Sequence, residues 1–195
     1  MALFRIITGE DLTLNGILNY LTDYKIHPLN TVVYLDCFGI CIDNMAYDMM
    51  FIKEIYNKTS GKQYHHIILS LEKDESYSNI NLQKLIMASR DFANYIYQYE
   101  RVQLAFAVHT NTDNWHCHFI LNSIKIDNGN RLNFCLKDLE RYRNILDIIL
   151  FKYGFSKIIR PRYEKFNNKN YSKNILKYIE TDEYKDIKNM KKLFK

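Results

Sequence analysis

The chain is poor in the residues that mark the extreme classes of protein. Its 195 residues include only two Pro and six Gly, which excludes collagen-like and linker-like chains. No apolar run approaches membrane-spanning length, and the N-terminal stretch MALFRIITGEDLTLNG reaches acidic residues and Gly too early for a signal peptide. The four cysteines form no CxxC pair. Together these features predict a cytosolic protein with reduced thiols.

Aromatic and other hydrophobic residues are plentiful. Sixteen Tyr and eleven Phe argue against a disordered chain, because disordered segments are poor in aromatics. Hydrophobic residues make up 47% of the sequence, which is enough for one sizeable core or for a core with an appendage.

Positive charge is concentrated at the C-terminal end. Residues 1–151 hold 14 basic and 17 acidic side chains, a net charge of −3. Residues 152–195 hold 13 basic and 5 acidic side chains, a net charge of +8. This asymmetry predicts a basic extension that meets a polyanion, although a solvated C-terminal tail would show the same composition.

Hydrophobic periodicity predicts an alternating series of strands and helices. Strands are expected at 2–8, 31–36, 63–72, 102–109 and 115–126, and RLNF should return as another strand after the turn at 127–130. Helices are expected after an Asp11 or Thr13 cap, from Asp43 or Asn44 onward, at 79–98 and at 136–153, with a short one near 173–179. The hairpin-like connections favour an α+β fold with a central, mainly antiparallel sheet of about five strands covered by helices.

Three of the six histidines fall within ten residues, as H-x6-H-x-H. His116 and His118 point to one face of a strand, and a hairpin-length loop should fold His109 back beside them. Three converging imidazoles suit a divalent metal with open coordination positions, and Asp113 in the loop could orient one of the rings. A His-x-His pair on an ordinary polar face remains the alternative.

Two further groups of residues could join such a site. His66 shares a strand face with Tyr64 and Ser70, so we take it as a site residue and its neighbour His65 as structural or exposed. On the other strands, Ala105 and Ala107 alternate inward with His109 and should leave room before the metal. Cys37 and Cys41 have no second ligand pair at matching spacing, so a structural zinc site there is not favoured.

The segment HTNTDNWHCHFILNS resembles the metal-binding motif of plasmid mobilisation relaxases, members of the HUH endonuclease superfamily. NGILNYLTD is similar to the family's tyrosine motif, YNKTSGKQYHHIILSLEKDE to the joining segment and KYGFSKI to the end-of-domain pattern. The resemblance thus covers nearly all of residues 1–165. It implies that Tyr20 is the nucleophile and that His109, His116 and His118 bind the metal. His66 matches a recurrent histidine, whereas Asn111 stands where many relatives have an acid.

The resemblance implies a bacterial, cytoplasmic DNA relaxase that nicks one strand at an origin of transfer. The tyrosine would form a 5′-phosphotyrosyl adduct, assisted by Mn²⁺ or Mg²⁺. Its partners would be single-stranded origin DNA, an adjacent hairpin or duplex, and accessory relaxosome proteins. Tyr24, one helical turn after Tyr20, is the alternative nucleophile.

The expected division is a catalytic domain over residues 1–159 and a DNA-contacting extension over residues 160–195. Aromatic residues alternate with basic ones in this extension, as in surfaces that bind phosphates and stack on unpaired bases. The basic candidates for DNA contact are Arg160, Arg162, Lys165, Lys169 and Lys173.

Three other functions share parts of this pattern. A replication initiator or transposase of the same superfamily usually carries its tyrosine after the histidine motif, whereas Tyr20 precedes it here. A non-catalytic DNA-binding module would close the metal site with a fourth ligand, Cys117 or Cys135. A metal-dependent hydrolase that uses water would leave no covalent protein–DNA adduct.

Overall fold

The computed structural model describes residues 2–7, 13–22 and 32–159. In these ranges five strands and four α-helices alternate, with two short 3₁₀ turns, η1 and η2. The elements are β1 (Leu3–Ile7), α1 (Leu14–Thr22), β2 (Val32–Phe38), η1 (Ile42–Asn44), α2 (Met45–Ile55), β3 (Tyr64–Ser70), η2 (Lys73–Glu75), α3 (Asn79–Glu100), β4 (Val102–His109), β5 (His116–Lys125) and α4 (Leu136–Lys152).

The strands form one antiparallel sheet in the order β1-β3-β5-β4-β2. This confirms the predicted α+β architecture with a five-stranded sheet. The returning strand predicted at RLNF was wrong, because only an isolated bridge joins Ile124 to Arg131. Strand β3 occupies this edge of β5 from His116 to Asn122, so the returning segment bonds only to the last residues of β5, Ser123 to Lys125.

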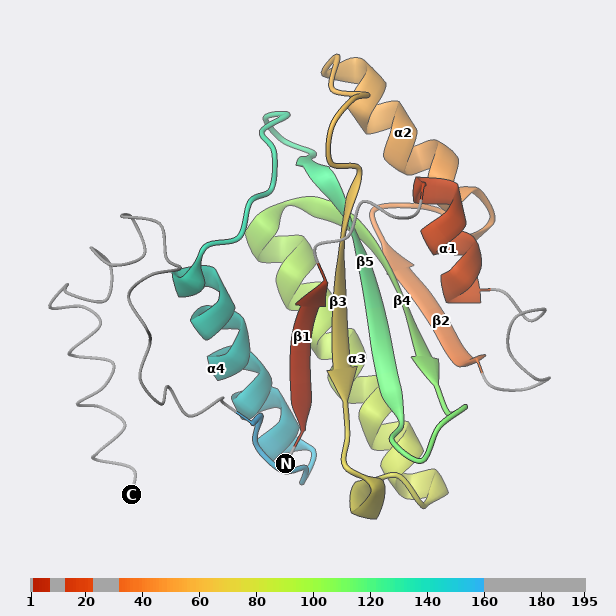
Figure 1. The fold of residues 1–195 in the computed structure, drawn as a ribbon, viewed down its shortest axis with the longest axis vertical. Helices are drawn as coiled ribbons and strands as arrows, with labels where there is room; N and C mark the ends of the chain where they lie inside the picture. The colour runs from red at the N-terminus through yellow and green to blue at the C-terminus, as the bar shows by residue number, and fades with distance from the viewer. Residues whose placement is uncertain (1, 8–12, 23–31, 160–195) are drawn as a thin grey trace, which may run out of the picture. The chain divides into compact units, whose positions relative to one another are not determined.

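The two faces of the sheet carry separate hydrophobic clusters. Helices α3 and α4 cover one face, where Phe92 and Tyr142 pack against strand residues such as Phe119. Helices α1 and α2 cover part of the other face, where Leu21 and Met49 are fully buried. Figure 1 shows α3 behind the sheet and α1 beside α2 in front of β2 and β4.

Local signals explain where the helices begin and end. The hydroxyl of Thr13 accepts a hydrogen bond from the Gly16 N–H (3.0 Å) and caps α1, which agrees with one of the two predicted caps. Ser78 caps α3 in the same way by accepting from the Asn81 N–H (3.1 Å). After α4, Gly154 adopts a φ of 80°, which only glycine reaches without strain, and the helix stops as predicted.

Several predictions lie outside the described residues, namely Asp11, Tyr24, the short helix near 173–179 and the basic candidates from Arg160 onward. The boundary between residues 159 and 160 therefore stays a prediction. None of the described helices is long and apolar enough to cross a membrane. All four cysteines are free, in agreement with the expected reduced thiols.

One buried charge is unusual in this core. The side chain of Lys53, in α2, is fully buried, and its Nζ has no hydrogen-bond partner among the described residues. Burial, with a smaller contribution from the positive charge of Arg131, lowers the pKa of Lys53 from 10.5 to about 8. At neutral pH the folded protein therefore holds an ammonium group in an environment that disfavours its charge.

We predict that Lys53→Met stabilises the protein at pH 7 by about 3 kcal/mol, since each pKa unit corresponds to roughly 1.4 kcal/mol. Between pH 8 and 10.5 the unfolded chain binds the Lys53 proton more tightly than the folded protein does. The wild type should thus gain stability as pH rises through this window, and the variant should lack that gain. Urea unfolding at pH 7 and pH 10 measures both, with exposed Lys137→Met as the control. Parallel pH profiles for wild type and Lys53→Met would contradict the prediction.

Candidate active site

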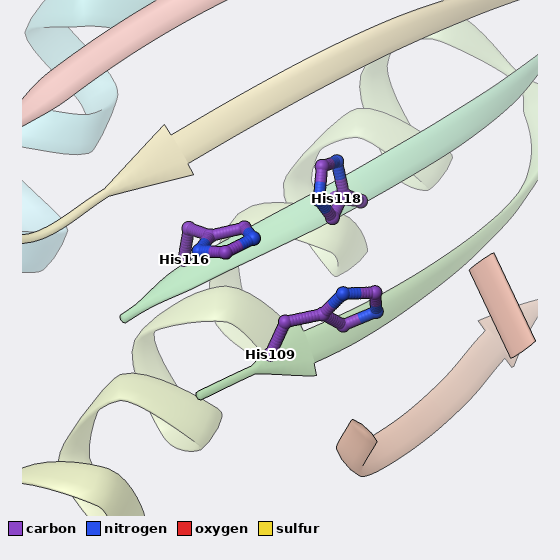
Figure 2. A group of neighbouring side chains, drawn as sticks. All are labelled: His109, His116 and His118. Carbon is purple, nitrogen blue, oxygen red and sulfur yellow. The ribbon is translucent and has the colours of Figure 1, made fainter. Parts of the chain in front are cut away.

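The β4–β5 pair brings the three histidines of the motif together. In the antiparallel register, His109 lies opposite His116 and Ala107 lies opposite His118. Side chains alternate between the two faces of a strand, so all three imidazoles project from the same face (Figure 2). One ring nitrogen from each lies within 4.8 Å of the others, and the three ring centroids are 4.8–5.6 Å apart. This arrangement can hold a divalent metal ion.

Backbone carbonyls orient two of the three rings. His109 Nε2 lies 3.2 Å from the Leu21 carbonyl oxygen, and His116 Nδ1 lies 2.9 Å from the Asn114 carbonyl oxygen. Each of these nitrogens carries the proton that it donates, so Nδ1 of His109 and Nε2 of His116 can offer lone pairs. Metal-binding histidines commonly donate their other ring N–H in this manner. The donor set therefore fits a metal ion.

The third ring, His118, contacts a side chain instead. His66 Nε2 lies 2.8 Å from His118 Nδ1, and the two ring centroids are 5.0 Å apart. Both residues are buried. Burial lowers the pKa of His66 to about 4, which keeps this imidazole neutral at physiological pH. The structure thus joins His66, from β3, to the triad on β4 and β5.

The loop between β4 and β5 is tied to the connection that follows β3. The Asn114 side-chain amide donates to the Leu71 carbonyl (2.8 Å), and the Trp115 N–H donates to the Ser76 hydroxyl (3.0 Å). Within the loop, the Thr112 hydroxyl donates to the Asn114 carbonyl (2.7 Å), the same oxygen that faces His116. These contacts hold the start of β5 in place.

Asp113 differs from its expected role. Its carboxylate forms an exposed ion pair with Lys73 (2.8 Å) across the two loops and contacts no histidine. This pairing lowers the pKa of the Asp113 carboxyl and raises the pKa of Lys73. The rings that Asp113 was expected to orient are instead held by backbone carbonyls and by His66.

Helix α1 places Tyr20 beside the triad. The Tyr20 ring meets the His118 ring edge to face, with centroids 5.6 Å apart and an interplanar angle of 82°. Ala105 and Ala107 were expected to leave room before the metal, but they are buried in the cluster that α1 and α2 form on the sheet. Their small side chains let α1 lie close to β4, which carries Tyr20 to the histidines.

Three nearby residues that could have joined the site, His65, Cys117 and Cys135, lie away from it. His65 is buried on the far face, where its Nε2 lies 2.8 Å from the Leu132 carbonyl oxygen and its ring packs against Phe134. Burial lowers its pKa to about 4 as well. Cys117 is buried in the cluster on that face, and Cys135 is exposed at the start of α4, where it bonds to Asp138. Neither cysteine belongs to the His109–His116–His118 group.

The face of the sheet that carries the three histidines, here called the site face, is only partly covered by the described helices α1 and α2. The register places Leu3 and Arg5 of β1 on the same face as Ser70 and Ile68 of β3, next to His116 and His118. Leu3 and Arg5 are exposed. Sequence reasoning did not single out Arg5 or the orienting carbonyls of Leu21 and Asn114, since a backbone carbonyl has no sequence signature.

Comparison with known proteins assigns the chain to a family. Residues 20–155 match the family described as "Relaxase: MobA/VirD2-like, nuclease domain", which covers most of the chain. The chain belongs to this relaxase family. The match includes Tyr20, His66 and the three histidines of the motif, and it confirms the resemblance read from the sequence. Residues 20–155 thus correspond to the nuclease domain of this relaxase family.

Individual relatives agree with this assignment. Protein rlx of Staphylococcus aureus is 30% identical over 105 residues, which are 53% of this chain and 30% of that protein. The chain therefore spans only part of this curated relative. Two Mn-bound crystal structures of the MobM relaxase domain with oriT DNA of plasmid pMV158 share the fold, with TM-scores of 0.57 and 0.56. Both are 14% identical; the first match covers 92% of this chain and 99% of the other, and the second covers 91% and 98%.

We predict that Asp113→Asn changes the Mn²⁺ affinity by less than about threefold, because the carboxylate pairs with Lys73 and not with a ligand. Removing a group that orients a ligand typically weakens metal binding about 10- to 100-fold. Calorimetric titration with Mn²⁺ distinguishes the two cases. Lys73→Met, which removes the other half of the ion pair, is the matched control and should behave alike. A tenfold weakening confined to Asp113→Asn would restore the role expected from the sequence.

Proposed function

We propose that this relaxase domain nicks one DNA strand at an origin of transfer by transesterification from Tyr20. The observation that carries the proposal is the edge-to-face contact between Tyr20 and His118, a member of the triad. It brings a phenol, the only nucleophile type that the family resemblance implies, to the one cluster of described residues suited to a metal. The relatives bound to oriT DNA support the choice of substrate.

The reaction exchanges one phosphodiester bond for another. The Tyr20 oxygen forms a bond to the scissile phosphorus, and the bond from phosphorus to the 3′ oxygen breaks. The phenol loses its proton, and the departing 3′ oxygen gains one to become a hydroxyl. A 5′-phosphotyrosyl link remains on the protein, so the strand can be resealed by the reverse reaction without ATP.

Three neutral imidazoles, those of His109, His116 and His118, would hold the divalent metal. When bound, the ion supplies positive charge to the non-bridging phosphate oxygens, which makes phosphorus more electrophilic. An all-imidazole set favours Mn²⁺ over Mg²⁺, since nitrogen ligands suit softer ions. The Mn-bound structures of the MobM relaxase domain support the same choice.

The protein's own groups supply orientation. Leu21 lies next to Tyr20 in α1, and its carbonyl accepts from His109 (3.2 Å), so the helix that carries the nucleophile also contacts the triad. A reacting group held in this manner avoids much of the entropy cost of meeting its target. His66 belongs to the same constellation through His118.

The geometry disfavours one of the alternative functions, and the order of the motifs in the sequence disfavours another. A closed structural site needs a fourth ligand, but Cys117 points to the opposite face of β5 and Cys135 lies at the start of α4. A replication initiator or transposase usually carries its tyrosine after the histidine motif, whereas Tyr20 precedes it. A hydrolase that activates water is separated by the adduct experiment below.

We predict that Tyr20→Phe forms no covalent adduct with DNA, because it lacks the oxygen that attacks phosphorus. Labelled single-stranded origin DNA is incubated with the protein and Mn²⁺, and adducts are resolved on a denaturing gel. Tyr24→Phe is the matched control four residues further along the sequence and should form the adduct at the wild-type rate. Adduct from Tyr20→Phe would remove this residue from the mechanism, and nicking by the wild type without any adduct would indicate hydrolysis by water.

The scissile strand would lie on the uncovered part of the site face, and the basic extension would supply further DNA contacts. Arg5 is exposed on this face and can meet a phosphate beside the triad. The extension over residues 160–195 would hold the strand through its cations, with nearby aromatics stacking on bases. Action in the bacterial cytoplasm, together with accessory relaxosome proteins, belongs to the same proposal.

We predict that neutralising the extension weakens DNA binding at least tenfold and flattens its salt dependence. For single-stranded DNA, the slope of log affinity against log salt falls by about 0.7 for each phosphate that the protein no longer neutralises. Fluorescence anisotropy at several salt concentrations measures both effects. The variant replaces these side chains by Gln in the full chain: Arg160, Arg162, Lys165, Lys169 and Lys173. The control replaces Lys84 of α3 and Lys137 of α4 by Gln, because these helices cover the face of the sheet away from the histidines. Equal DNA affinity of the two variants would refute the prediction.

A further inference from the structure

We propose that His66 is a positioning residue that sets the ring orientation and the proton position of His118. The inference rests on the proposed metal site, and it assigns a role to a histidine that contacts the triad without belonging to it. It concerns how the chain prepares one ligand, so it is testable without DNA.

The sheet register makes the contact possible. His66 of β3 lies opposite Ile120 of β5, and His118 lies opposite Ile68, so the two histidines are diagonal neighbours on one face. Diagonal neighbours across antiparallel strands are within reach of long side chains. Here the rings close the remaining distance to 2.8 Å between His66 Nε2 and His118 Nδ1, with their planes tilted by 38°.

The hydrogen bond determines where the protons lie. A metal ion on His118 would take the lone pair of Nε2, because Nδ1 already faces His66. Nδ1 of His118 then carries the hydrogen and donates it, and Nε2 of His66 accepts. His66 consequently holds its own hydrogen on Nδ1. Each imidazole stays neutral, and the pair has a single arrangement that leaves His118 ready to bind a metal.

His118 is a sensitive point for such control. It is 3% exposed and His66 is 6% exposed, so water cannot readily replace the contact. His109 and His116 donate to backbone carbonyls, which no side-chain substitution removes. The Tyr20 ring also packs on His118. A rotation of His118 would therefore disturb both a metal ligand and the packing that positions Tyr20. His66 thus acts through His118 and not on the reacting atoms.

The test measures Mn²⁺ affinity by calorimetry on the full chain without DNA. His66→Leu removes the acceptor and should raise the Kd about 10- to 100-fold. His66→Gln restores an amide oxygen near the position of Nε2 and should stay within about threefold of the wild type. His65→Gln is the matched control on the same strand, since His65 is equally buried but faces the other side of the sheet. It should lower stability without changing the Mn²⁺ Kd.

A second measurement covers the case in which His66→Leu fails to fold. Ring ¹⁵N chemical shifts of the Mg²⁺-loaded wild type and of His66→Gln should both show His118 protonated on Nδ1. Protonation on Nε2 in the wild type, or a wild-type Mn²⁺ Kd for folded His66→Leu, would overturn the inference. Failure of the wild type to bind Mn²⁺ or Mg²⁺ would instead overturn the proposed metal site, so the two failures are distinct.

Discussion

The register between β4 and β5 is the constraint on which the rest of the site depends. Because side chains alternate along a strand, a shift of one residue would turn His116 and His118 to the opposite face. That face is the buried hydrophobic cluster that contains Cys117 and Phe119, where the two imidazoles would be separated from His109 and from solvent. The contacts of Asn114 and Trp115 with the chain after β3 hold the loop, so they also hold the register.

Helix α1 packs on the face of the sheet that carries the three histidines. Ile17 and Leu21 bury their side chains against the alanines of β4, and this packing fixes the distance between helix and sheet. The last carbonyls of a helix lack partners within it, and the Leu21 carbonyl finds one in His109. The C-terminal end of a helix also carries partial negative charge, which favours a cation nearby. The helix that presents Tyr20 therefore supports the triad electrostatically and sterically.

Much of this could be predicted from the sequence, because the signals were periodic. Alternation located all five strands, and the spacing of His109, His116 and His118 predicted their convergence. RLNF had the composition of a strand, but the pairing of β5 on both sides is a property of the whole sheet and leaves no local trace. Asp113 was expected near a ring because it is close in sequence, yet its exposed carboxylate meets Lys73 from another loop. His65 and His66 are both buried, and burial lowers the pKa of each, so only the face of the sheet that each occupies separates the structural residue from the site residue.

The charge distribution follows from the same arrangement. Residues 1–151 carry a net charge of −3, which would oppose DNA if binding depended on that part of the chain as a whole. The local charge at the triad would differ from this net charge. Its three imidazoles are neutral, so a bound divalent metal would place two positive charges beside the scissile phosphate. A lysine cluster at the same place would attract phosphates along any stretch of DNA, whereas a metal held by three ligands from one hairpin acts at a single point. In the function that we propose, the metal site performs the chemistry at one phosphate, and the basic C-terminal segment, with its net charge of +8, supplies most of the affinity for DNA.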